Sequence, residues 1–145
     1  GGHLVSSVYF QSIDRPENAC FLSEYSARFN GYGSPSVDTE AAYLCGIMLG
    51  RAIAEAGTAD VSGVREALYR DRYEAPQGPV SVDPENNHAF LTPRLGRSTA
   101  EGSFEILWEA PEPVKPDPYL AWLDLEALAG ESDSAVSKDP SRLLL

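Results

Sequence analysis

Residues 75–119 constrain the fold most, because turns divide this segment into short extended stretches. Three such stretches, at 78–83, 88–97 and 103–108, are joined by the turn sequences DPENN and AEG, and a proline-rich run follows them. A sheet this small buries a face only by packing it against another element. The segment therefore predicts a small β meander that lies on a larger α/β body.

The residues before the meander predict one strand followed by three helices. Residues 4–10 are mostly apolar and β-rich, as in a buried strand. Asp14 followed by Pro16 is typical of a helix start, so we expect Asp14 to cap the first helix, and Asp60 to cap the third. A single strand before helices cannot build a parallel sheet alone. We expect its neighbours to come from a missing N-terminal part of the same protein or, alternatively, from a partner chain.

The second helix begins near 36–40 and ends at Gly57. Its apolar residues cover more than half of its circumference, so we expect a deeply buried helix. Cys20 and Cys45 fall on apolar faces of the predicted helices. We expect two buried thiols, with a single bridge between adjacent helices as the alternative. Two cysteines are too few for a zinc-type metal site, and no cofactor is expected.

The charge balance argues against nucleic acid as a partner. The chain has 22 acidic and 11 basic residues and a net charge of -11, so a phosphate backbone would be repelled. No apolar run has the length of a membrane span, and the first residues do not resemble a secretion signal. The sequence alone leaves the compartment open.

The residues show no arrangement typical of an enzyme. His3 is at the start of the chain, and His88 follows two asparagines in a predicted turn. The glycine-rich, nucleophile-elbow and zinc-protease motifs are absent from the sequence. The acidic residues at 101–112 alternate with apolar ones, as on the solvated face of a strand. We therefore expect no catalytic activity.

Several separated motifs resemble one family in the same order along the chain. They are YFQSID at 9–14, PEN at 16–18, EAAY at 40–43, APQGPV at 75–80, DPENNH at 83–88 and WEAPEPVKPDPY at 108–119. Together they are similar to the C-terminal part of solute-binding proteins for urea and short-chain amides, a group that includes the amide sensor of an aliphatic amidase operon. The resemblance implies the type I periplasmic-binding-protein fold, in which two Rossmann-like α/β lobes close on a solute.

This resemblance also implies how the chain is divided. Residues 1–14 would finish one lobe and form a hinge crossover, and residues 15–74 would be the helical part of the other lobe. Residues 75–119 would return to the first lobe as the meander, and residues 120–145 would be a C-terminal extension with a flexible end. A proline-rich hinge suits lobe closure, because a few residues absorb the rotation.

Residues at the crossover and at the mouth of the second helix are expected to face the solute. These candidates are Tyr9, Gln11, Ser12, Val37, Asp38 and Glu40. Urea and amides present donors and a carbonyl acceptor, so their site needs carboxylate or amide groups with hydroxyls on an aromatic floor. The structural alternative places Tyr9 in the core, uses Gln11 and Ser12 to satisfy hinge backbone groups, and makes Asp38 a helix cap.

Two functions follow from the resemblance. The first is the solute-binding component of an ABC importer for urea or short-chain amides, located in the periplasm or at the cell surface, with an ABC permease as partner. Branched-chain amino acids are a less favoured solute for it. The second is a cytoplasmic amide-sensing regulator whose partner is a transcription antiterminator.

Residues 1–145 alone are expected to bind none of these solutes, because the resemblance places half of the cleft in segments outside the chain. Calorimetric titration with urea, acetamide and butyramide at millimolar concentrations tests this expectation. Saturable heat from the isolated chain would contradict it.

Overall fold

A computed structural model describes residues 2–30 and 33–118 of the chain. The predicted C-terminal extension at 120–145 lies outside the described residues. Within them the order of elements begins with β1 (Leu4–Ser7), α1 (Pro16–Arg28), α2 (Val37–Ala56) and α3 (Val61–Arg70). Five strands follow: β2 (Arg72–Ala75), β3 (Gly78–Val82), β4 (Ala89–Phe90), β5 (Arg94–Ser98) and β6 (Phe104–Glu109).

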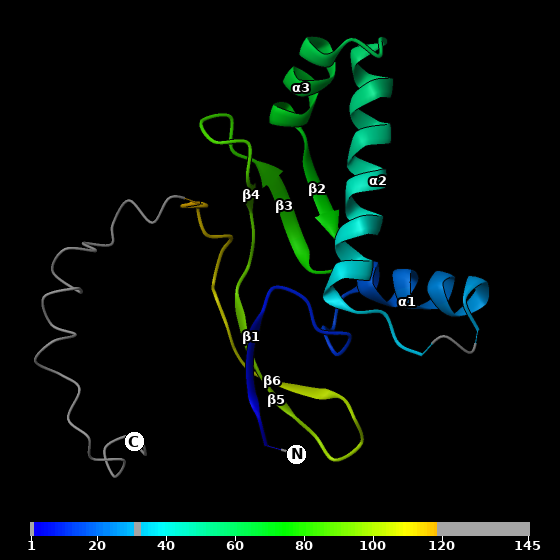
Figure 1. The fold of residues 1–145 in the computed structure, drawn as a ribbon, viewed down its shortest axis with the longest axis vertical. Helices are drawn as coiled ribbons and strands as arrows, with labels where there is room; N and C mark the ends of the chain where they lie inside the picture. Colours follow the sequence, from blue (N-terminus) through cyan, green and yellow to red (C-terminus); the bar gives the residue numbers. More distant parts are fainter. Residues whose placement is uncertain (1, 31–32, 119–145) are drawn as a thin grey trace, which may run out of the picture.

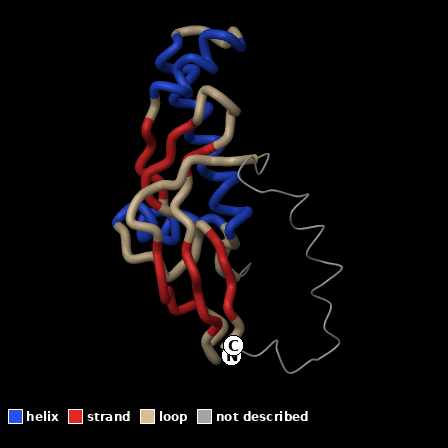
Figure 2. The backbone as a smooth tube through the Cα atoms, turned by 90° about the vertical axis from the view of Figure 1, so that its left-hand side faces the viewer, coloured by secondary structure: helices blue, strands red, loops and turns tan. Residues whose placement is uncertain are grey.

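The strands form two separate antiparallel sheets. One has the order β2-β3-β4 and the other the order β1-β5-β6. In Figure 1, α2 and α3 lie beside β2 and β3 in the upper part of the molecule, and β1, β5 and β6 occupy the lower part. Figure 2 shows the same division from the side, with one sheet above the other. The mixed α/β class predicted from the sequence is confirmed.

The structure corrects four expectations about the strands. The segment at 75–119 is not one meander, because β3 and β4 pair with β2, which was not predicted, while β5 and β6 pair with β1. β1 ends at Ser7, and its neighbour in the sheet is the antiparallel β5 of this same chain. Residues after Ser7 leave the strand because Tyr9 and Phe10 turn into the core. The expected burial of β1 is also wrong, since the Leu4 side chain is 62% exposed.

The first helix begins without the predicted cap. Pro16 occupies the first helical position as expected, but the N-cap residue is Arg15, which makes no side-chain capping bond, and Asp14 is exposed. Buried Asn18 ties this helix to the preceding crossing instead. Its Nδ2 donates to the backbone oxygens of Gln11 at 3.0 Å and Ile13 at 2.8 Å. Contacts between the helix and the crossing thus hold this helix start in place of a cap.

The ends of α2 and the start of α3 lie where the sequence predicts them. Ser36 and Thr39 form a reciprocal capping box at the start of α2, and Gly57 ends this helix with φ 62. Asp60 accepts from the backbone N–H groups of Ser62 and Gly63 at the start of α3, as predicted.

A smaller share of the α2 surface is buried than its apolar composition predicts. Only Glu40, Leu44, Met48 and Ala52 are buried, and their spacing of four places them on one stripe. The opposite face is open, with Leu49 50% exposed. Expectations for the cysteines are wrong for the same reason: Cys20 and Cys45 lie on exposed faces of α1 and α2 and are free thiols. Apolar composition predicted burial, but the described part of the chain covers only one side of each helix.

Two core clusters lie on either side of the junction between the sheets. One contains Tyr9, Phe10, Ile13 and Phe21, and the other contains Leu44, Met48, Ala75 and Val80. Phe10 lies directly on β5, because a Cβ atom on Gly96 would meet its ring at 2.6 Å. This glycine therefore allows the first crossing of the chain to pack closely on the lower sheet.

The chain passes between the two sheets at residues 8–15, 91–93 and 110–113. The second and third passes are joined by backbone bonds, from Ala110 N to Pro93 O at 3.0 Å and from Val114 N to Leu91 O at 2.8 Å. Among the described residues, the first pass has no strand partner. It is attached to the others mainly through side chains.

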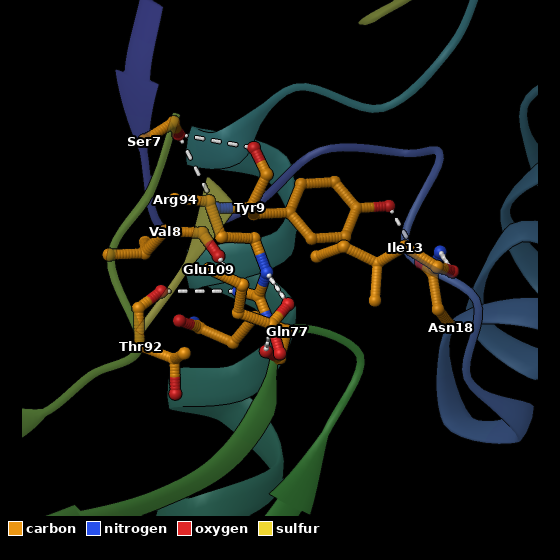
Figure 3. Close-up of polar contacts among 9 residues, drawn as sticks. All are labelled: Ser7, Val8, Tyr9, Ile13, Asn18, Gln77, Thr92, Arg94 and Glu109. Carbon is orange, nitrogen blue, oxygen red and sulfur yellow. Dashed lines mark hydrogen bonds and ion pairs between the residues drawn. The ribbon is translucent and has the colours of Figure 1, made fainter. Parts of the chain in front are cut away.

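Arg94 links the first two passes to the end of β6 and to the turn between β2 and β3 (Figure 3). Its guanidinium donates to the backbone oxygens of Val8 at 2.5 Å, Thr92 at 3.2 Å and Gln77 at 2.8 Å, and to the carboxylate of Glu109 at 2.5 Å. The residue is only 3% exposed. A buried cation is tolerated when an anion and further acceptors surround it, and the planar fork of arginine donates in several directions at once.

Arg94→Lys is expected to lower the free energy of unfolding by roughly 3 kcal/mol, because one ammonium group cannot replace bonds in all these directions and leaves buried carbonyls unpaired. Chemical denaturation measures the loss. Arg97→Lys, on the same strand, is the matched control. Its ion pair with Glu105 is exposed and 3.7 Å long, so this variant should lose at most about 0.5 kcal/mol. Equal losses in the two variants would contradict the role given to Arg94.

Candidate functional site

A cavity of about 230 Å³ lies where the first crossing meets the start of α2. It collects residues that are far apart in the sequence, from β1, the crossing, the loop before α2 and β6. Its lining residues are Val5, Ser7, Tyr9, Phe10, Gln11, Pro35, Ser36, Val37 and Phe104. The lining combines aromatic and aliphatic walls with a few hydroxyl and amide groups, as in small-molecule sites.

A larger cavity of about 480 Å³ lies between α1 and α2 and is mostly apolar. Aromatic residues of the two helices line it, among them Phe21, Tyr25 and Tyr43. It contains none of the residues that the sequence predicts at the solute site. We therefore take the smaller cavity at the crossing as the candidate site.

The structure brings three of the six predicted residues to this cavity. Tyr9, Gln11 and Val37 line it, from two segments that α1 separates in the sequence. Tyr9 offers its ring and not its hydroxyl, because the hydroxyl donates to Asn18 Oδ1 at 2.9 Å (Figure 3). Gln11 holds Asn18 through its backbone oxygen, which leaves its side-chain amide for the cavity.

The other three predicted residues lie outside the cavity lining. Ser12 and Asp38 are exposed, one in the turn of the crossing and the other in the first turn of α2. The cap of this helix is Ser36, so Asp38 does not have the capping role that the structural alternative assigned to it. Glu40 is fully buried and accepts a hydrogen bond from Gln77 Nε2 at 2.9 Å.

The start of α2 directs the positive end of its helix dipole at one side of the cavity. First-turn N–H groups of a helix have no helical partner and carry the positive end of the helix dipole. Ser36 satisfies Thr39 N through its hydroxyl, and its backbone oxygen accepts from Glu40 N. The backbone N–H groups of residues 37 and 38 are the other two donors at this end of the helix. Asp38, in the same turn, adds a negative charge that weakens the potential.

Burial shifts two titratable groups close to the cavity. It raises the pKa of Glu40 to about 7, while hydrogen bonds from Gln77 and the positive charge of Arg94 lower it to a smaller extent. Burial, together with the negative charge of Glu40, raises the pKa of Tyr9 well above its usual value. The phenol of Tyr9 is therefore neutral throughout the physiological range.

Sequence reasoning missed Arg94 and Gln77. Neither lines the cavity, but Arg94 binds the first crossing through Val8 and Gln77 binds α2 through Glu40. Gln77 stands inside the motif APQGPV of the resemblance, but the sequence indicates no role of its own for it. Arg94 begins a strand and is 3% exposed, whereas a strand-end arginine is normally solvated. Its burial depends on carbonyls distant in sequence, so no local pattern could reveal it.

The arrangement is suited to noncovalent recognition. Among the described residues, no group of three or more His, Cys, Asp and Glu could hold a metal ion. In the same part of the chain, no helix combines the length and apolarity of a membrane span. The cavity offers aromatic surface, the side-chain amide of Gln11 and a helix start, groups suited to contact and hydrogen bonding with a small molecule. The Ser7 and Ser36 hydroxyls of its lining are engaged with backbone groups.

Comparison with solved structures identifies the same architecture in two-lobed solute-binding proteins. An ABC-transporter solute-binding protein from Rhodopseudomonas palustris HaA2, in complex with p-hydroxybenzoic acid, is 26% identical, with TM-score 0.71 over 84% of this chain and 34% of that chain. A second, from Rhodopseudomonas palustris BisB5 with 3,4-dihydroxy benzoic acid, is 21% identical, with TM-score 0.71 over 81% and 32%. The leucine-binding protein of Thermotoga maritima is 18% identical, with TM-score 0.62 over 74% and 30%.

One curated relative has a different description. A Geobacillus stearothermophilus protein described as limonene hydroxylase is 30% identical over 122 residues, which are 82% of this chain and 22% of that protein. The chain thus spans less than a quarter of this relative and about a third of the solved structures named above. Those structures carry aromatic acids or are named for leucine, so specificity for urea or amides stays a prediction.

The pattern of the periplasmic binding protein domain family matches residues 1–124. This match covers most of the chain and agrees with the fold of the solved relatives. The chain corresponds to a part of the two-lobed fold, as the resemblance predicted. It belongs to the periplasmic binding protein domain family.

Proposed function

We propose that this chain is part of the solute-binding component of an ABC importer, and that the cavity at the start of α2 forms one wall of its solute cleft. The observation that carries the proposal is the meeting of Tyr9, Gln11 and Val37 in one cavity at the junction of the sheets. The relative from Rhodopseudomonas palustris HaA2, described as an ABC-transporter solute-binding protein, supports the same assignment. The rest of the cleft, the permease partner and a periplasmic location belong to this proposal.

The junction is the hinge in this proposal. β1, β5 and β6 belong to one lobe, and the three helices with β2, β3 and β4 belong to the other. This places the lobe boundary at residues 91–93, later than the boundary at 74/75 that the resemblance implied. The passes at 8–15, 91–93 and 110–113 then absorb the rotation of the lobes.

The proposed solute is a small organic acid with an apolar, preferably aromatic, body. Val5, Phe10 and Phe104 provide apolar walls, and the start of α2 attracts a carboxylate. Urea offers little apolar surface, so these walls contribute little to its binding. The complex of the 26% identical relative with p-hydroxybenzoic acid supports the same class.

Short amides are the second candidate, because the side-chain amide of Gln11 in this cavity can both donate to and accept from an amide solute. A protein that binds only amides would fit either an amide importer or the cytoplasmic regulator that acts on an antiterminator. The two candidate solutes differ in charge, because the organic acid is an anion and the short amide is neutral. A variant that changes charge without changing size therefore separates them.

Gln11→Glu in the complete protein is expected to weaken binding of 4-hydroxybenzoate by at least about tenfold, since a carboxylate in the wall repels the carboxylate of the solute. Gln11→Met, similar in size but uncharged, is the matched control and should retain most of the affinity. Isothermal titration with 4-hydroxybenzoate, leucine, urea and acetamide measures the four affinities for each variant.

The outcomes of this titration are distinct. Saturable binding of urea or acetamide, without binding of the acids, would overturn the proposed solute class and favour the amide branch. Equal affinity of the wild type, Gln11→Glu and Gln11→Met for the bound solute would show that the cavity is not part of the cleft.

A further inference from the structure

A buried acid–amide pair joins α2 to the turn between β2 and β3. The side chain of Glu40 is 0% exposed and that of Gln77 is 3% exposed. Gln77 Nε2 donates to Glu40 Oε2 at 2.9 Å. The second oxygens of the pair, Glu40 Oε1 and Gln77 Oε1, are also buried, and neither has a hydrogen-bond partner among the described residues. Two neighbouring side chains thus each present an unsatisfied acceptor, which destabilises a buried site.

A single proton satisfies both acceptors. A neutral carboxyl group has one O–H donor, whereas an ionised carboxylate only accepts. With the proton on Oε1, Glu40 donates to Gln77 Oε1 while Gln77 Nε2 donates to Glu40 Oε2, so the acid and the amide close a ring of two hydrogen bonds. We propose that Glu40 and Gln77 form a proton-binding site, in which the neutral carboxyl of Glu40 is hydrogen-bonded twice to the amide of Gln77.

Burial of this pair favours the neutral acid, while hydrogen bonds from Gln77 and the charge of Arg94 act in the opposite direction to a smaller extent. Tyr9 from the first crossing, Tyr73 from β2 and Arg94 from β5 are the titratable or charged groups that interact with Glu40. Burial raises the pKa of Glu40 to about 7, and the positive charge of Arg94 opposes this effect without cancelling it. Burial is also the main cause that raises the pKa of Tyr73 to about 12. Both tyrosines are therefore neutral where Glu40 titrates and supply no counter-charge.

Arg94 does not form an ion pair with Glu40. Its donors are engaged by the backbone oxygens of Val8, Thr92 and Gln77 and by the carboxylate of Glu109. The same Gln77 thus gives its backbone oxygen to Arg94 and its side-chain amide to Glu40, and its backbone N–H also interacts with Glu40 and lowers the pKa of that carboxyl. Loss of the proton from Glu40 would act directly on the turn that Arg94 ties to the crossings.

The proton site gives the fold a pH dependence of definite sign. Because the pKa of Glu40 in the folded chain lies above that of an unfolded glutamate, the folded state holds this proton more tightly. The stabilisation is complete below the unfolded pKa and is lost as pH rises through about 7. This inference depends on the contacts of Glu40 and Gln77 and not on the proposed solute.

Chemical denaturation of the complete protein between about pH 5 and about pH 8 tests the site. The contribution of Glu40 should raise the unfolding constant by roughly two orders of magnitude over this range. Glu40→Gln should remove that contribution, because an amide donates and accepts at the same two positions at every pH. Glu66→Gln, which neutralises an exposed carboxylate on α3, is the matched control and should retain the slope of the wild type.

Carbon-13 NMR of the labelled glutamate carboxyls provides a second measurement on the wild type, which needs no variant to fold. The Glu40 carboxyl should titrate near pH 7 and remain neutral below it. Titration in the range of an exposed glutamate would overturn the inference, and it would indicate that an ordered water satisfies the two oxygens beside an ionised Glu40. A Glu40→Gln variant with the slope of the wild type would overturn it as well.

Discussion

The buried guanidinium of Arg94 is the interaction on which the junction of this molecule depends. Its hydrogen bonds are shared among several partners. It donates to the backbone oxygens of Val8, Thr92 and Gln77 and forms an ion pair with Glu109. These acceptors come from segments that cross between the sheets or turn beside them. Only a side chain with donors fixed in several directions can hold them together, because an aliphatic residue of the same size would leave each oxygen buried and unpaired.

Both the candidate solute cavity and the proton site are built around this junction. The first crossing supplies Tyr9 and Gln11 to the cavity directly after Val8, and Gln77 carries the amide that binds Glu40. A change in the position of the crossing therefore moves a wall of the cavity. In a protein whose lobes rotate, such a junction keeps the crossings in register while their backbone angles change.

Local features of the sequence predicted helices better than strands. Ser36, Gly57 and Asp60 mark helix ends correctly because each acts on backbone groups within a few residues. Asp14 fails as a cap because Asn18 binds the crossing and holds the helix start in another way. Leu49 and Cys45 on α2 show that apolar composition does not specify burial, which depends on the elements that cover each face.

The sequence by itself determined the α/β class, the three helices and the family, since these follow from periodicity, capping residues and motifs along the chain. Only the tertiary structure decided the division of the strands into two sheets, which three of the six candidate residues line the cavity, and the roles of Arg94 and Gln77. The bond from Arg94 to Val8 spans 86 residues. Contacts at that separation depend on how whole elements pack, and no local pattern of residues encodes them.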